Sequence, residues 1–291
     1  MPRLLLALAL SLLIAIPFVP AQQQRPQVPE GAKVLRDLAY LPDNIVRHRL
    51  DLYLPKDAAE PCPLVIWIHG GAWQGGSKNG TPGVVMLKHG FAVASINYRL
   101  TDAAPYPAQI EDCKAAVRWL RAKAKEYNLD PQRFGAWGAS AGGHLVALLG
   151  TTSDMKELEG KDGNLEQSCR VQAVCDWFGP TDLTGMRGNL ADNPDGPVYK
   201  LLGGPPSEKS DLARLASPVK FCKKECPPFL IMHGDKDNLV PLRQSQIMES
   251  ALKKEGVPVE LVVVEGKGHG TLGADAVKKV ESFFLDALKK K

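Results

Sequence analysis

The pentapeptide Gly138-Ala139-Ser140-Ala141-Gly142 matches the pattern G-x-S-x-G near the middle of the chain. Residues 133–137, before it, are mostly apolar and strand-like, and residues 143–149, after it, are small and apolar with helical spacing. Strand, tight turn and helix form the context in which this pattern makes a nucleophile elbow, with the serine hydroxyl exposed at the carboxyl edge of a sheet. The sequence therefore predicts Ser140 as a nucleophile, and a serine hydroxyl needs a base to take its proton.

We expect His269 to be this base. It lies in a glycine-rich loop directly after the last apolar strand, so its imidazole can approach the elbow without crowding. The other histidines fit less well, because they lie away from strand ends, inside the helix after the elbow, or directly before a glycine whose loop they would hold: His48, His89, His144, His69 and His233.

An acidic residue must orient this histidine. The loop after the preceding strand, His233-Gly234-Asp235-Lys236-Asp237, offers two. Their side chains can point in different directions, so we expect only one to reach His269 and favour Asp237, which leaves Asp235 to brace the loop. Asp182 follows another strand and is a third candidate, although an Asx turn or a helix cap explains it as well. The chain order Ser, Asp, His is that of α/β-hydrolases, and it differs from the chymotrypsin and subtilisin orders.

Attack on an ester carbonyl places negative charge on oxygen, and that charge needs fixed hydrogen-bond donors. The run His69-Gly70-Gly71-Ala72-Trp73 follows an apolar strand and offers exposed backbone N–H groups. We expect Gly71 and Ala72 to form an oxyanion hole together with the N–H of Ala141, the residue after the nucleophile. Alanine stands at the last position of the usual H-G-G-G run, and a backbone donor tolerates its methyl group.

Two tryptophans and two irregular segments are candidates for substrate binding. Trp73 follows the oxyanion run and Trp177 ends another strand, so either indole can wall a pocket. Residues 152–168 and 189–215 are polar and rich in Gly, Asp or Pro. Long irregular segments after strands are where lids and substrate loops tend to lie, and surface padding is the alternative.

The elements that position these residues alternate along the chain. We expect strands at 33–41, 48–54, 64–68, 91–96, 134–137, 171–178, 229–232 and 259–264, and helices at 84–88, 110–125, from 141, 242–254 and 274–288. This alternation predicts an α/β fold with a mostly parallel sheet and helices on both faces. The turn Pro42-Asp43-Asn44 predicts an antiparallel hairpin at one edge. No repeat or linker divides residues 33–291, which we expect to form a single catalytic domain.

Residues 1–21 have the pattern of a secretory signal peptide, with Arg3, an apolar run over 4–16 and the small cleavage residues Val19-Pro20-Ala21. The apolar run is too short to span a bilayer comfortably, although an uncleaved anchor is the alternative. Residues 22–32, rich in Gln and Pro, predict a flexible segment. We therefore expect an exported protein, periplasmic or extracellular.

The six cysteines all lie in this exported part, where they can form disulfides. Cys222 with Cys226, and Cys169 with Cys175, are candidate pairs, and free buried thiols are the alternative. Their spacing does not match a zinc site. We therefore expect no metal. The net charge of +4 is not gathered in a basic stripe interleaved with aromatic residues, so we expect no nucleic-acid partner. No second long apolar run follows residues 4–16, so we expect no stable membrane partner.

The chain resembles the α/β-hydrolase superfamily from about residue 33 to its C-terminus. The resemblance rests on three runs and two single residues: His69-Gly70-Gly71-Ala72-Trp73, Asn97-Tyr98-Arg99 and Gly138-Ala139-Ser140-Ala141-Gly142-Gly143-His144, together with Asp237 and His269. More narrowly, it is similar to secreted bacterial esterases of the BD-FAE group, near the hormone-sensitive-lipase-like, acetylxylan and feruloyl esterases. In such proteins the aspartate of a D-x-x-V-P run is the triad acid. That run is Asp237-Asn238-Leu239-Val240-Pro241 here, so the resemblance supports Asp237.

The resemblance implies a serine carboxylesterase that cleaves short-acyl esters, small or borne on polysaccharide, without a metal or organic cofactor. It leaves the natural ester open, because function resides in the pocket. Two other hypotheses are a serine peptidase of the prolyl-oligopeptidase kind, for whose usual propeller domain this chain has no room, and a non-catalytic binding protein on a hydrolase fold.

Overall fold

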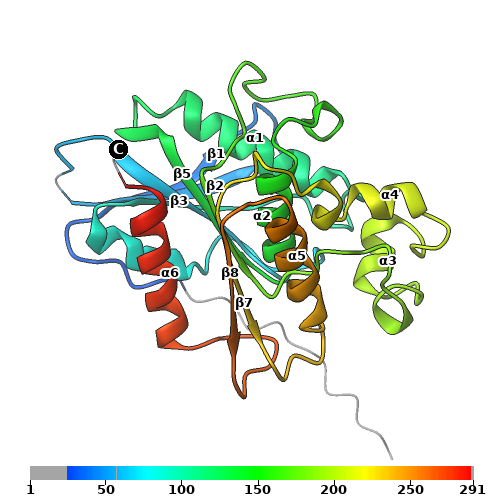
Figure 1. The fold of residues 1–291 in the computed structure, drawn as a ribbon. Helices are drawn as coiled ribbons and strands as arrows, with labels where there is room; N and C mark the ends of the chain where they lie inside the picture. The colour runs from blue at the N-terminus through cyan, green and yellow to red at the C-terminus, as the bar shows by residue number, and fades with distance from the viewer. Residues whose placement is uncertain (1–24, 57, 290–291) are drawn as a thin grey trace, which may run out of the picture.

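An eight-stranded sheet in the order β1-β2-β4-β3-β5-β6-β7-β8 runs through the computed structural model, which describes residues 25–56 and 58–289 (Figure 1). The strands are β1 (Lys33–Ala39), β2 (Arg49–Leu54), β3 (Cys62–Ile68), β4 (Ala92–Ile96), β5 (Leu129–Ala139), β6 (Ala173–Trp177), β7 (Phe229–Gly234) and β8 (Val259–Val264). β1 pairs antiparallel with β2, and β2 pairs antiparallel with β4. All other neighbours are parallel. The predicted fold class is confirmed. The signal peptide predicted for residues 1–21 lies outside the described residues.

Helices cover both faces of this sheet, and β3 and β4 are accordingly buried along their whole length and apolar except for Ser95 in β4. One core cluster includes Ile110, Leu145 and Met248, contributed by α1 (Ala108–Ala122), α2 (Ala141–Thr151) and α5 (Arg243–Lys254). The other includes Val84 and Val280, contributed by the 3-10 helix η1 (Pro82–His89) and by α6 (Ala274–Ala287). Figure 1 shows α6 on the opposite side of the sheet from α2 and α5.

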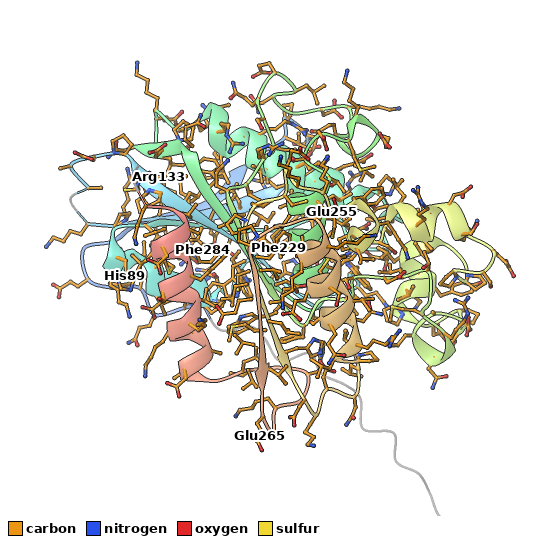
Figure 2. All side chains as sticks on the ribbon, viewed as in Figure 1. His89, Arg133, Phe229, Glu255, Glu265 and Phe284 are labelled. Atoms are coloured by element: carbon orange, nitrogen blue, oxygen red, sulfur yellow. The ribbon has the colours of Figure 1, made fainter. Side chains whose placement is uncertain are left out.

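Two phenylalanines labelled in Figure 2 show how closely these layers approach. A Cβ atom on Gly135 of β5 would come within 2.6 Å of the ring of Phe284, which belongs to α6. A Cβ atom on Gly150 of α2 would come within 2.7 Å of the ring of Phe229, which belongs to β7. Both glycines therefore leave room for aromatic rings, so that α6 packs directly on β5, the strand that carries the elbow, and α2 packs directly on β7.

The segment between β6 and β7 differs from its prediction as an irregular region. It contains η3 (Gly188–Leu190), α3 (Pro197–Leu202), α4 (Ser210–Leu215) and η4 (Pro218–Phe221), and Figure 1 shows α3 and α4 standing to one side of the sheet. Tyr106 anchors them: its N–H donates to Leu201 O at 2.8 Å and its hydroxyl to Leu215 O at 2.9 Å. Residues 152–168 contain only a short 3-10 helix, η2 (Lys156–Leu158).

All six cysteines are free thiols, so neither candidate disulfide is present. Cys175 lies within β6 and is fully buried, while Cys169 contacts Glu159 Oε1 at 3.2 Å. Cys222 contacts Met248 at 3.8 Å. In the part of the chain that the structure describes, no helix combines the length and the apolar character needed to cross a membrane.

Candidate active site

Ser140, His269 and Asp237 form a continuous hydrogen-bonded chain. His269 Nε2 lies 2.8 Å from Ser140 Oγ, and His269 Nδ1 lies 2.7 Å from Asp237 Oδ2. An ionised carboxylate only accepts hydrogen bonds, so the proton of the neutral imidazole belongs on Nδ1. Nε2 is then free to accept the proton of the serine hydroxyl. The three side chains follow β5, β7 and β8, at the edge of the sheet where parallel strands end.

Ser140 occupies a strained turn between β5 and α2. Its φ of 57° and ψ of −120° are unfavourable for a residue with a side chain, and such conformations persist only where the surroundings fix them. The N–H of Ser140 donates to Trp177 O at 2.8 Å, and Ser140 O accepts from His144 N at 3.0 Å. A Cβ atom on Gly142 would overlap Ile68 O. The predicted elbow therefore has the expected geometry, and its glycine is required by the close approach of β3.

The carboxylate of Asp237 is fully shielded from solvent and held from two sides. Its Oδ1 accepts hydrogen bonds from the N–H groups of Leu239 and Val240, each at 2.9 Å. Its other oxygen is thereby turned toward His269. The D-x-x-V-P run thus forms a turn that fixes the acid.

The two other acid candidates are engaged elsewhere. Asp235 Oδ1 accepts from Gly266 N at 2.6 Å and so ties the loop after β7 to the loop after β8, the bracing role that we expected. Asp182 forms an Asx turn with Thr184 N at 3.0 Å and pairs with Lys220 at 2.8 Å. Neither carboxylate is among the hydrogen-bond partners of His269 in the described residues.

Residues 69–76, which follow β3 and which we call the glycine loop, lie against the elbow. A Cβ atom on Gly70 would come within 2.8 Å of Ala139 O and 3.3 Å of Ser140 Cβ. Gly71 and Ala72 have positive φ, at 112° and 55°. Among the described residues, no protein acceptor takes the N–H of Gly71, Ala72 or Ala141. These donors are available to an oxygen atom next to Ser140.

The two predicted pocket tryptophans are almost completely covered by protein. Trp73 is 3% exposed, and its indole packs edge-on against His144 with 5.2 Å between ring centroids. Trp177 is 5% exposed and packs edge-on against Trp137 at 5.0 Å, in the core cluster on the α6 side of the sheet. This burial gives no support to a pocket role for either indole. Trp177 contributes through its backbone carbonyl instead.

Phe178 was not assigned a role from the sequence, yet its ring meets His269 edge-on at 4.7 Å. It is buried and has a φ of 46°, so the chain after β6 bends sharply to present it. An aromatic residue at the end of the predicted strand 171–178 was the only sequence signal. Phe178 limits the positions that the imidazole can adopt.

Asp176 lies near the end of β6. Among the described residues, it is the one carboxylate with a buried oxygen atom that has no hydrogen-bond partner. Its Oδ1 accepts from Gly179 N at 2.9 Å, while Oδ2 has no partner. Burial raises the pKa of Asp176 to about 7, against the opposing effect of the Gly179 N–H. With a pKa near 7, the carboxyl is protonated in a part of the molecules at neutral pH, and the protonated form needs less solvation.

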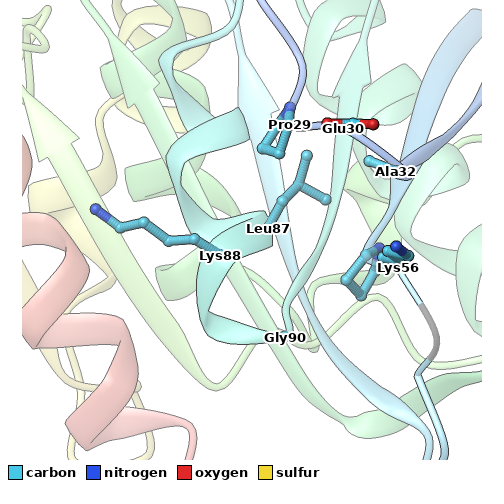
Figure 3. Close-up of a pocket in the computed structure, with 8 residues that line it drawn as sticks. Pro29, Glu30, Ala32, Lys56, Leu87, Lys88 and Gly90 are labelled. Carbon is cyan, nitrogen blue, oxygen red and sulfur yellow. The ribbon is translucent and has the colours of Figure 1, made fainter.

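The described residues contain no group of three or more His, Cys, Asp or Glu side chains placed to hold a metal ion. A hollow of about 370 Å³, shown in Figure 3, is lined by residues that include Pro29, Lys56, Leu87 and Gly90. Gly90 comes just before β4, whereas Ser140 follows the end of the parallel strand β5. This hollow therefore lies at the edge of the sheet opposite the Ser140 site.

Known proteins similar to this chain are esterases. The chain is 29% identical over 265 residues to the esterase LipQ of Mycobacterium tuberculosis, covering 84% of this chain and 57% of the relative. It spans about half the length of the first curated relatives that it matches. Among solved structures, a truncated carbohydrate esterase from gut microbiota superposes with a TM-score of 0.85 at 36% identity, covering 90% of this chain and 99% of that one.

An acetyl ester-xyloside bifunctional hydrolase from Caldicellulosiruptor lactoaceticus superposes with a TM-score of 0.72 at 27% identity, covering 89% of this chain and 97% of that one. The sequence model of the BD-FAE family matches residues 50–252, which include the elbow, the glycine loop and Asp237. The fold, the elbow and this match agree: the chain belongs to the BD-FAE family of α/β-hydrolases.

Proposed function

We propose that this protein is an exported serine carboxylesterase that hydrolyses short-acyl esters carried on carbohydrate, through an acyl-enzyme. The observation that carries the proposal is the hydrogen-bonded chain from Asp237 through His269 to Ser140, with bonds of 2.7 and 2.8 Å. A serine activated in this way is a nucleophile for carbonyl carbon.

In the first half-reaction Ser140 Oγ attacks the ester carbonyl carbon while its proton passes to His269 Nε2. The carbonyl oxygen becomes negatively charged and accepts hydrogen bonds from the N–H groups of Gly71, Ala72 and Ala141. Asp237 stabilises the imidazolium through Nδ1. The tetrahedral intermediate collapses, the alcohol leaves with the proton from Nε2, and an acyl-serine ester remains.

In the second half-reaction a water molecule gives a proton to His269 Nε2 and its oxygen attacks the acyl carbon. The second tetrahedral oxyanion uses the same three N–H donors. Collapse breaks the bond to Ser140 Oγ, which regains its proton from the imidazolium, and the carboxylic acid leaves. Phe178, against the His269 ring at 4.7 Å, keeps the imidazole within reach of both oxygen atoms.

The substrate class rests on the names of similar proteins. The structural neighbours at 36% and 27% identity are described as a carbohydrate esterase and an acetyl ester-xyloside hydrolase. Acetyl and feruloyl groups on plant polysaccharides are esters of this kind. The signal pattern of residues 1–21 supports a site of action outside the cytoplasm, where such polymers occur.

The test of the mechanism is p-nitrophenyl acetate hydrolysis by Ser140→Ala. We expect kcat to fall by about 10⁴-fold or more, because removal of a triad nucleophile has effects of this size. Ser250→Ala is the matched control, because this serine is exposed on α5 and donates to Gln246 O at 2.8 Å. Full activity of Ser140→Ala would refute the mechanism. A fluorophosphonate should label wild-type Ser140, and its failure to do so would favour a non-catalytic protein.

The substrate class is tested with acetyl-xylan, methyl ferulate, p-nitrophenyl esters of increasing chain length and a peptide amide. We expect turnover of the acetylated polymer and of short esters. Activity confined to long acyl chains contradicts the short-acyl assignment, and preferential peptide cleavage favours the peptidase alternative. N-terminal sequencing of protein released by an expressing host tests export, with an expected start near Gln22.

A further inference from the structure

The glycine loop is held in a conformation that its own residues disfavour. Ala72 and Trp73 have φ of 55° and 58°, and Gly71 and Gly76 are also in the left-handed region. Positive φ at a residue with a side chain costs about 1–3 kcal/mol and persists only when surrounding contacts enforce it. Contacts from outside the loop must therefore supply this restraint.

Arg47, in the segment before β2, supplies two such contacts and makes a third with the segment after β4. Its Nη1 donates to Gly76 O at 3.0 Å, at the end of the glycine loop. Its Nη2 lies 3.2 Å from His69 Nε2, at the start of the loop. Its Nε donates to Tyr98 O at 3.0 Å. One half-buried guanidinium thus joins both ends of the loop to the segment after β4.

The contact with Arg47 fixes the protonation of His69. An arginine can only donate hydrogen bonds, so His69 Nε2 must accept. The proton of the neutral ring is then on Nδ1, which donates to Gly70 O at 2.7 Å. The imidazole stacks on Tyr98 with 4.4 Å between centroids. Burial lowers the pKa of His69 to about 3; the Gly70 carbonyl opposes this effect and the Arg47 charge adds to it.

The bond to Gly70 O sets the direction of a neighbouring donor. The peptide that joins Gly70 to Gly71 is trans, because the one cis peptide bond in the described residues precedes Pro107. In a trans peptide the C=O and N–H bonds point in opposite directions. When His69 holds Gly70 O on its own side, the N–H of Gly71 points away from His69. A peptide flip would remove this donor from the oxyanion hole.

We propose that Arg47 is a positioning residue for the oxyanion hole, acting through His69 and the Gly70 carbonyl on the N–H of Gly71. This inference rests on the proposed function, in which that N–H binds the oxyanion. Three hydrogen bonds in series also polarise one another, so the positive guanidinium strengthens Gly71 as a donor. Tyr98 supports the same arrangement, because its hydroxyl donates to His69 O at 3.0 Å.

The test compares Arg47→Met with Arg49→Met. Arg49 lies two residues further along the chain and donates to a backbone carbonyl, Asp37 O, at 3.0 Å, so it is a matched control. We measure kcat and KM for p-nitrophenyl acetate, and Ki for a short trifluoromethyl ketone that forms an oxyanion-bearing adduct with Ser140. Arg47→Met should lower kcat by about 10- to 100-fold and raise Ki by a similar factor, with KM within about twofold, because a loosened oxyanion donor affects the transition state selectively.

A kcat for Arg47→Met within about twofold of wild type overturns the proposal, as does a loss of kcat with unchanged Ki. Arg49→Met should change none of the three constants by more than about twofold. If Arg47→Met is unfolded at the assay temperature, Arg47→Lys provides the same test. The planar guanidinium of arginine bonds both His69 and Gly76, and the single ammonium group of lysine cannot reproduce this pair of contacts. Its kcat should be lower than that of wild type and its Ki higher, by similar factors.

A nitrogen NMR spectrum of His69 separates this proposal from the proposed function. In the wild type we expect a protonated Nδ1 and an unprotonated Nε2 at neutral pH, and a mixture of tautomers in Arg47→Met. A protonated Nε2 in the wild type overturns the role of Arg47 even if ester turnover is high. If the expected tautomers are observed but the protein has no esterase activity, the proposed function is wrong, whereas the restraint of the glycine loop by Arg47 still holds.

Discussion

His233 Nε2 lies 3.2 Å from Oδ2 of Asp237, the same oxygen that accepts a hydrogen bond from His269. Val240 O can only accept, so its 2.9 Å contact with Nε2 places the proton of His233 on that nitrogen. Nδ1 then accepts from the hydroxyl of Ser245 at 2.7 Å. Burial lowers the pKa of His233, against the effects of the Val240 carbonyl and the Asp237 charge. The carboxylate of Asp237 thus has the neutral ring of His233 on one side, and this ring covers the carboxylate without neutralising its charge.

Replacing this acid should be far more damaging than replacing its neighbour. Asp237→Asn keeps the shape but no longer favours the Nδ1–H tautomer of His269, so we expect kcat/KM to fall by about 10³- to 10⁴-fold. Asp235→Asn removes a charge that holds Gly266 N and should lower activity only a few-fold. Steady-state kinetics on p-nitrophenyl acetate measures both. The opposite ranking would show that Asp237 is not the acid.

The elbow should not accept a methyl group at Gly142. A Cβ atom there would overlap the carbonyl oxygen of Ile68, and both partners are backbone, so β3 or α2 must shift. We expect Gly142→Ala to lower the free energy of unfolding by about 3 kcal/mol or more, the upper range for overpacked sites. Gly185→Ala, where a Cβ atom meets nothing within 4 Å, is the control and should change it by less than about 1 kcal/mol. Urea unfolding followed by tryptophan fluorescence checks both, and equal losses would contradict the prediction.

Asp176 should make stability depend on pH. Burial raises its pKa to about 7 from an ordinary value of 3.8. From about pH 4 to about pH 7 the folded protein holds a proton that the unfolded chain has released, so this contribution to stability is lost as the pH rises and is constant above that window. Asp176→Asn does not titrate, so its stability relative to wild type should increase by up to about 1.4 kcal/mol per pH unit across the window. Urea unfolding of both proteins at several pH values measures the difference in their free energies of unfolding. A difference that does not change with pH would contradict the prediction.

The strands and the order of the site residues were predictable because each depends on a local pattern. Residues 64–68 form a continuous apolar run and fall within β3, and the glycine pattern around Ser140 requires a strand before it and a helix after it. Parallel strands end at one edge of a sheet, so residues after three different strands could be expected to meet. The alternation did not fix the lateral order, in which β4 lies between β2 and β3.

Features that depend on distant contacts could not be predicted. Nothing in the sequence around Arg47 indicates that its guanidinium reaches His69 and Gly76, because no spacing rule links a segment before β2 to a loop after β3. The helices α3 and α4 each have six residues, too few for periodicity to identify, and their Pro- and Gly-rich surroundings suggested an irregular segment. The burial of Trp177 against Trp137 depends on which face of β6 it occupies, and a continuous apolar strand does not reveal that.

The bond between His269 and Ser140 joins residues separated by 129 positions, and His269 follows β8, the last strand of the sheet along the chain. That bond requires β8 to be paired with β7 at the edge of the sheet and β5 to be in place near its centre. Closing contacts of such long sequence separation is slow relative to local helix formation. The proposed esterase activity should therefore be among the last properties to return on refolding, after far-ultraviolet circular dichroism has recovered, so that turnover reports assembly of the sheet from β5 to β8.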